Sequence, residues 1–320
     1  MTMRLSSKQS TLLVLAALMI VSPFFFPSNY YYRIGSLVFV NSIAVVGIVI
    51  LTGYAGQISL GHAGFLGIGG YACALLPIHL GVPPALAAVL GAVLSGIIAY
   101  GVGRPILRLK GYYLAVASLG FGVLVAMVLA NEGWLTGGPD GVKVPDPGLR
   151  AALEWLGIPL ANPQLWYAFS GLVLFVGAWL ALNLRDSPTG RALRALHGSE
   201  VAARTAGVDI ARAKLNAFVI SAVYASVAGS LLALQNRLIT PDVAGFMHSI
   251  ELVTMAVLGG AGSVLGGIFG AALLTLLPQV LTVLQDYEHV VLGLVMMLVM
   301  IFLPAGLIPS ARRLLRGRGE

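Results

Sequence analysis

Apolar runs of close to 20 residues recur along the whole chain, and they limit the possible folds more than any other feature. Each run is long enough to cross a hydrocarbon core of about 30 Å. The sequence is 58% hydrophobic and only 10% charged, whereas a soluble domain carries about 25% charged residues. Because lipid offers open backbone groups no hydrogen-bond partner, the runs are expected to be helices. The chain is therefore predicted to be an all-α integral membrane protein.

Hydropathy and the positions of glycine and proline predict about ten transmembrane helices. With the N-terminus inside, the segments facing the cytoplasm hold 15 of the 19 basic residues. Basic residues remain on the cytoplasmic side of a membrane, so both termini are predicted to be cytoplasmic. A missed pair of spans, or a re-entrant segment counted as two, would satisfy the same test. The ten spans are expected at 11–27, 36–53, 61–80, 84–103, 111–130, 165–184, 215–234, 249–264, 266–284 and 290–308.

Residues 1–320 are predicted to form a single transmembrane domain, because no stretch is long and polar enough to be a separate soluble domain. The two longest polar segments are 131–164, expected on the outer face, and 185–214, expected in the cytoplasm. Two halves of five spans would be related by inversion if they are repeats, which is a common transporter plan. The sequence itself shows little internal similarity, so the inverted repeat is a hypothesis.

The stretch TGYAGQISLGHAGFLGIGG at 52–70 places seven glycines between two apolar runs. Glycine in a helix costs about 1 kcal/mol relative to alanine. Residues 53–60 are therefore predicted to be irregular, and 61–74 to be a flank of small residues that lets helices pack closely. Gln57, Ser59 and His62 are candidates for lining a substrate path; His62 could instead bond across a tight helix turn.

Glu251 is a fourth candidate for the path, because an ionisable residue within a membrane span is a functional hypothesis by default. It lies at the start of the apolar run 249–260. The alternative is a position near the membrane interface, where Glu251 would pair with Arg237 or His248. No group of residues resembles a metal site or a nucleophile with its base, so no catalytic residue, metal or cofactor is predicted.

The cytoplasmic segment 185–214 is predicted to contain two short helices, at 191–196 and 199–207. Ser199 can cap the second helix, with Glu200 in its first turn, and Gly207 would end it. Glu200 and Arg204 are four residues apart and could support each other. A capped helix in such a loop suits docking to another protein, although contact with lipid headgroups is an alternative.

Glu200, Ala202, Ala203 and Gly207 form the pattern E-x-A-A-x-x-x-G. It resembles the "EAA" loop of ATP-binding-cassette importer permeases, with one extra residue, Val201. GYAGQISLGHAGFLGIGGYACALL at 53–76, LKGYYLAVASLGFG at 109–122, LTGGPDGV at 135–142 and SIELVTMAVLGGAGSVLGGIFGA at 249–271 resemble, in the same order, the membrane subunit of branched-chain amino-acid importers, the LivM type. The resemblance covers roughly 36–308.

The resemblance implies a subunit of a bacterial inner-membrane importer. Its partners would be a second, homologous permease subunit of the LivH type, two cytoplasmic ATP-binding subunits and a periplasmic binding protein. Ser199, Glu200, Ala202, Ala203, Arg204 and Gly207 would then couple the permease to the ATPases. The sequence has no G-x-x-x-x-G-K-[ST] phosphate loop, so ATP would be hydrolysed by partner chains and not by this one.

The outer segment 131–164 is the candidate surface for the binding protein, and Asp140 and Glu154 are its candidate residues. The alternative is a loop that only packs over the spans. The favoured substrates are branched-chain or other apolar amino acids. Urea or short-chain amides, and a secondary transporter driven by ions through Glu251, are the alternatives. The net charge of +7 is attributed to membrane orientation and not to nucleic acid.

Overall fold

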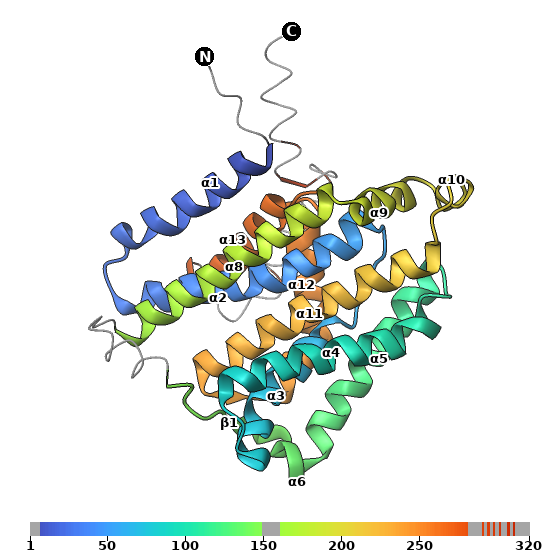
Figure 1. The fold of residues 1–320 in the computed structure, drawn as a ribbon. Helices are drawn as coiled ribbons and strands as arrows, with labels where there is room; N and C mark the ends of the chain where they lie inside the picture. Colours follow the sequence, from blue (N-terminus) through green and yellow to red (C-terminus); the bar gives the residue numbers. More distant parts are fainter. Residues whose placement is uncertain are drawn as a thin grey trace, which may run out of the picture.

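The computed structural model describes residues 7–148, residues 161–280 and eight single positions between 290 and 310. Apart from two short strands, its regular elements are helices (Figure 1). The long helices are α1 (Ser7–Val21), α2 (Asn29–Ile48), α3 (His62–Leu80), α4 (Pro84–Ile106), α5 (Tyr112–Asn131), α8 (Asn162–Asp186) and α11 (Ile210–Asn236). The shorter elements are α6 (Gly133–Thr136), β1 (Val142–Lys143), α9 (Pro188–Gly198), α10 (Glu200–Thr205), β2 (Leu238–Ile239), α12 (Phe246–Gly259) and α13 (Val264–Val280).

Seven helical segments of the described chain are long and apolar enough to cross a membrane. They coincide with the first seven predicted spans, although the second begins at Asn29 and not at 36. The eighth and ninth predicted spans are α12 and α13, with 14 and 17 residues, which rise about 21 and 25 Å. Most of the tenth, 290–308, lies outside the described residues. The count of ten and the inverted repeat therefore stay predictions.

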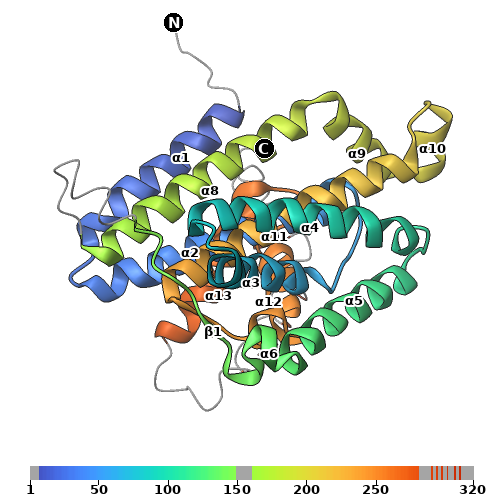
Figure 2. The same ribbon diagram turned by 60° about the horizontal axis from the view of Figure 1, so that its bottom comes forward.

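The helical bundle has two ends, seen in both ribbon views (Figures 1 and 2). At one end, here called the α10 end, α8 leads into α9 and α10, and α11 begins. At the other, the β1 end, β1 pairs antiparallel with β2. An ion pair between Arg237 and Asp146 joins the same two segments. The described parts of the two polar segments predicted from sequence thus lie at opposite ends of the bundle.

The centre of the bundle is α11, which packs against α2, α3 and α4. Helix α4 buries a row of small residues spaced four apart, including Gly91, Ser95, Ala99 and Gly103. Several of its large side chains are exposed, among them Leu90 and Ile97. Small residues on one helix face let two backbones approach closely, which favours association within lipid. The exposed face of α4 is apolar, as a face in contact with lipid must be.

Helices α3 and α11 approach most closely at glycine. A Cβ built at Gly229 would overlap the carbonyl oxygen of Leu66, and one built at Gly69 would overlap that of Ser226. A Cβ at Gly67 would lie 2.7 Å from that of Ala244. The prediction that 61–74 is a close-packing flank is confirmed by these contacts.

The predicted irregular segment is also confirmed. Helix α2 continues as one π-helical segment, Val49–Tyr54, and no helix follows until His62. Hydrogen bonds from the backbone N–H groups of Gly56 and Gln57 to the carbonyls of Thr52 and Leu51, both 3.1 Å, close the turn. Gly56 has a φ of +66°, a conformation that residues with a Cβ adopt rarely. Glycine at this position is therefore required by the turn itself.

Helix α3 begins inside the bundle. The ring of His62, the first residue of α3, is hydrogen-bonded to the hydroxyl of Ser221 in α11. Gly47 of α2 also packs against Ser221. Gly47 lies seven residues before the end of the π-helical segment, a rise of about 10 Å. The non-helical chain after Tyr54 therefore runs back alongside α2, with Gln57 and Ser59 buried and Gly56 and Ile58 exposed.

Helices α12 and α13 form a tight hairpin. A Cβ at Gly270 would overlap the carbonyl oxygen of Met255, and Gly259 and Gly266 oppose each other in the same way. The turn between the two helices rests on the π-helical segment, since a Cβ at Gly53 would overlap the carbonyl oxygen of Ala261. The hairpin therefore extends from the β1 end down to the break that follows α2.

Candidate functional site

A cavity of about 460 Å³ lies between α2, α11, α12 and α13. It is lined by the middle of α2, by α12 from Met247 to Met255 and by the last turns of α13. Tyr30, at the start of α2, donates a hydrogen bond of 2.6 Å to Gln279 of the lining. The cavity therefore lies in the half of the bundle nearer the β1 end, within the size range of about 300–1,000 Å³ usual for small-molecule sites.

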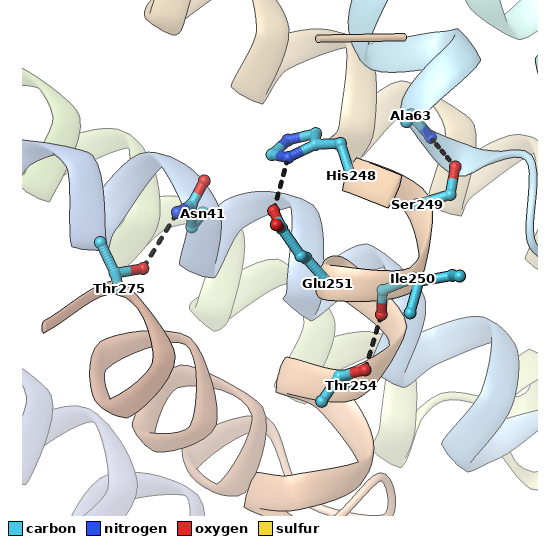
Figure 3. Close-up of polar contacts among 8 residues, drawn as sticks. All are labelled: Asn41, Ala63, His248, Ser249, Ile250, Glu251, Thr254 and Thr275. Carbon is cyan, nitrogen blue, oxygen red and sulfur yellow. Dashed lines mark hydrogen bonds and ion pairs between the residues drawn. The ribbon is translucent and has the colours of Figure 1, made fainter. Parts of the chain in front are cut away.

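Glu251 and His248 face each other at this cavity (Figure 3). Nδ1 of His248 lies 3.1 Å from Oε2 of Glu251, and the carboxylate side chain keeps 38% of its surface exposed. Arg237, the other partner considered from sequence, is paired with Asp146. Of the two, His248 is therefore the partner of Glu251, and the pairing leaves Glu251 at the cavity wall.

Asn41 and Thr275 form a second polar pair in the same lining (Figure 3). The Asn41 side-chain amide donates a hydrogen bond of 3.0 Å to Oγ1 of Thr275, and both residues are buried. Sequence reasoning missed this pair. A single asparagine inside the apolar run 36–51 was the available signal, because a buried amide in a membrane span needs a partner on another helix.

The side-chain hydroxyls of Ser249 and Thr254 are hydrogen-bonded to backbone groups (Figure 3). The Ser249 hydroxyl accepts a hydrogen bond of 3.1 Å from the backbone N–H of Ala63, which is one of the orphan donors at the start of α3. Thr254 donates to the carbonyl of Ile250 at 2.7 Å. Ser249 therefore ties α12, which carries Glu251, to the irregular entrance of α3.

The three other path candidates lie away from the cavity. His62 is completely buried, and its ring bridges two hydroxyls, with Ser59 at 2.9 Å from Nδ1 and Ser221 at 2.7 Å from Nε2. Phe65 and Phe218 contact the ring edge-on. The alternative of a bond across a tight turn, Ser59 to His62, is present in the structure. The ring also joins α3 to α11, and a role of His62 in the path stays a prediction.

Gln57 is buried, with 3% of its surface exposed. Neither atom of its side-chain amide has a hydrogen-bond partner among the described residues, while its backbone carbonyl accepts from the Thr52 hydroxyl at 3.1 Å. An unpaired buried amide costs free energy, so Gln57 is the least satisfied polar group of the irregular segment.

We expect His62→Ala to lower the free energy of unfolding by about 2–5 kcal/mol, because it opens a cavity and removes a partner from two buried hydroxyls. Thermal unfolding of the purified protein in detergent measures the change. His79→Ala is the matched control, since His79 is exposed near the end of the same helix. Equal unfolding temperatures for the two variants would contradict the bridging role.

The two predicted helices of segment 185–214 are present as α9 and α10. The Ser199 hydroxyl caps α10 by accepting from the backbone N–H of Ala202 at 3.3 Å. Gly207 follows α10 with a φ of +82°. The backbone N–H groups of Gly207 and Val208 donate to Arg204 and Ala203 at 3.0 Å, as in a helix end closed by a left-handed residue. The predicted start and stop signals are confirmed.

Helix α10 projects outward from the α10 end of the bundle (Figures 1 and 2). Val201 is 76% exposed, and Ala202, Arg204 and Thr205 are also exposed, whereas Ala203 is buried. The Glu200 carboxylate accepts a hydrogen bond from Lys214 of α11, which lowers the pKa of Glu200 below its ordinary value. The direct partner of Glu200 is therefore Lys214 of the next helix, and the expected support from Arg204 is present as a smaller electrostatic contribution to the same lowering of the pKa.

Helix α9 lies against the irregular segment. It contacts the π-helical residues 49–54 as well as α8 and α11, and a Cβ at Gly56 would lie 2.9 Å from Nδ1 of His197. Leu193 and Leu196 are buried on this side of α9. A displacement of the projecting helices would therefore act directly on the turn that leads into α3.

Asp140, a candidate docking residue, is exposed in the turn between α6 and β1. Glu154, the other docking candidate, and the short helix expected at 149–157 lie outside the described residues. The described part is anchored by the β1–β2 pairing and by the pair Asp146–Arg237. Asp140 thus lies in a turn at the β1 end that the neighbouring strand pair and ion pair anchor to the bundle.

The long apolar helices, the irregular segment between α2 and α3 and the cavity are features of a polytopic membrane protein of the transporter type. The family model for the permease component of branched-chain amino acid transport systems matches residues 31–300. The chain belongs to this permease family. No solved structure matches it.

Curated relatives support the assignment. The chain is 32% identical to the high-affinity branched-chain amino acid transport system permease protein LivM of Escherichia coli, over 95% of this chain and 76% of that protein. It is 28% identical to LivH of Salmonella typhimurium, over 83% of this chain and 90% of that protein. The ribose import permease protein RbsC of Haemophilus influenzae is 25% identical, over 86% and 84%.

Proposed function

We propose that this chain is the membrane-spanning permease subunit of an ATP-binding-cassette importer that moves branched-chain or other apolar amino acids into the cytoplasm. The observation that carries the proposal is the family match over residues 31–300, in a chain whose two 32–33% identical relatives are both named LivM. The cavity near the β1 end is the first part of the path in this proposal.

ATP is hydrolysed by two partner subunits that dock on α10 in this proposal. The exposed Val201 and Arg204 support it, because a short, capped and projecting helix with an apolar tip suits a cleft on another protein. The α10 end is then cytoplasmic. This agrees with the excess of basic residues in the segments at that end.

A second permease subunit of the LivH type and a periplasmic binding protein complete the proposed importer in the bacterial inner membrane. The 28% identity to a LivH protein supports a homologous partner, because homologous subunits can pack around a shared path. The binding protein would land at the β1 end, on the outer segment that carries Asp140.

Uptake into proteoliposomes that contain the assembled membrane complex tests the function. Labelled leucine is supplied with the binding protein outside and ATP inside, and uptake should stop when ATP is omitted. Uptake that persists without ATP and collapses with an uncoupler would indicate an ion-coupled carrier. Competition by urea or acetamide, and not by isoleucine or valine, would indicate the amide-permease alternative.

Reversing the charge at Asp140 should weaken capture of the binding protein. We expect Asp140→Lys to reduce pull-down of the binding protein by the reconstituted complex several-fold, and Asp140→Asn to have a smaller effect, because like charges replace opposite ones across the contact. The difference between the two variants should shrink at high salt, as exposed charges are screened. Equal capture by wild type and Asp140→Lys would remove Asp140 from the docking surface.

A further inference from the structure

The polar groups that line the cavity between α2, α11, α12 and α13 are one carboxylate, that of Glu251, and neutral amide, hydroxyl and imidazole groups. An ionised Glu251 carboxylate accepts only, so Nδ1–H of His248 is the donor in their 3.1 Å contact. Nε2 of the same ring has no hydrogen-bond partner among the described residues. Asn41 donates one amide N–H to Thr275, which leaves its carbonyl oxygen to accept and its second N–H to donate.

Positive charge is absent from the described lining, which contains no lysine or arginine. Arg237, which is close in sequence to α12, is held by Asp146. A carboxylate inside a membrane protein is costly unless it faces a cavity or a positive partner. Glu251 therefore places a carboxylate at the wall of a cavity large enough for a small molecule, with His248 as its hydrogen-bond partner among the described residues.

The rest of the wall is apolar. Leu37, Leu232, Ile250, Met255 and Leu274 contribute aliphatic or thioether side chains. A cavity with one acidic edge and an aliphatic wall is complementary to a molecule with one ammonium group and one branched aliphatic chain, because each part then keeps its hydrogen bonds or buries apolar surface.

We propose that Glu251 and Asn41 form the ammonium subsite of the permease itself, with the aliphatic wall of α2, α11, α12 and α13 holding the substrate side chain. The inference rests on the proposed function and adds a selection step to it: the membrane subunit recognises the α-amino group and does not only conduct what the binding protein delivers. His248 positions the Glu251 carboxylate through its Nδ1–H and is a positioning residue.

Binding to the assembled membrane complex in nanodiscs, without binding protein, tests the subsite. The probes are leucine, isopentylamine, which lacks the carboxylate of leucine, and isocaproate, which lacks its ammonium group. We expect leucine and isopentylamine to bind and isocaproate not to bind. Glu251→Gln should weaken isopentylamine about tenfold or more, since it replaces a charge-assisted hydrogen bond by a neutral one, and Glu251→Asp should restore part of the loss.

Asp242→Asn is the matched control, because Asp242 is exposed on the same side of the molecule and does not line the cavity. The proposal is overturned if isocaproate binds as well as isopentylamine, if Glu251→Gln binds normally, or if wild type binds no isopentylamine at millimolar concentration. Displacement of isopentylamine by sodium ions alone would also overturn it, in favour of an inorganic cation site.

The two proposals fail in different ways. ATP-driven leucine uptake by wild type with a normal Glu251→Gln variant removes the subsite and keeps the importer. Isopentylamine binding that is lost in Glu251→Gln, in a complex that shows no ATP-driven uptake, keeps the subsite and removes the importer.

Discussion

Valine at position 207 is expected to abolish ATP-driven uptake while the protein still inserts into the membrane. Gly207 has a φ of +82° at the end of α10, and nothing surrounds the position where its Cβ would be. The penalty is therefore one of backbone conformation, about 1–2 kcal/mol for a residue with a Cβ and worse for a β-branched one. The short helix α10 has little else to hold its end, so the strain should unwind it.

The expected measurement is a fall of about tenfold or more in leucine uptake, with hydrolysis of ATP by the partner subunits continuing. In the proposed importer, an α10 that is not rigid would not carry the ATPase movement to α9 and to the turn at Gly56. Gly207→Asn is the control, because asparagine tolerates the left-handed conformation better than other residues with a Cβ. Deletion of 199–207 should reproduce the valine phenotype. Normal uptake by Gly207→Val would remove α10 from the coupling role.

Leucine at position 229 is expected to prevent α3 and α11 from packing. A Cβ at this site would overlap the carbonyl oxygen of Leu66, which belongs to a helix backbone and cannot rotate away. Overpacking of ordinary cores costs about 1–3 kcal/mol. Here the whole helix must move, so the cost is expected at or above that range. Helix α11 is the centre of the bundle, so little folded protein should be recovered.

Size-exclusion chromatography and thermal unfolding in detergent measure this effect. Gly229→Ala should already lower the unfolding temperature, because the clash begins at Cβ. Gly120→Leu is the matched control, since Gly120 lies in α5 with open space around it. A Gly229→Leu protein as stable as Gly120→Leu would contradict the close approach of α3 and α11.

The class of protein and the local elements could be predicted from the sequence. The first seven spans, the irregular residues after Tyr54, the cap at Ser199 and the stop at Gly207 follow from signals that act within a few residues. Such signals depend on length, on backbone conformation and on hydrogen bonds close in the chain. They are the same whatever the rest of the chain does.

The cavity could not be predicted in this way. Asn41 and Thr275 are separated by 234 residues, and no local pattern joins them. The hydrogen-bond partner of Glu200 also depends on the tertiary structure. Lys214 reaches the carboxylate from the next helix, whereas the expected Arg204 lies on the same helix as Glu200. In both cases the deciding contact is between helices.

The sequence by itself determined that this chain is a helical membrane protein, where most of its described helices lie and which residues end α10. Only the tertiary structure decided which helix faces are buried, that His62 belongs to the core and that Glu251 borders a cavity. The reason is the solvent. In water the buried face of a helix is more hydrophobic than its exposed face, so the sequence predicts which face is buried. In lipid the exposed face is as apolar as the buried one. The two then differ only in small residues and in partners that the fold brings together.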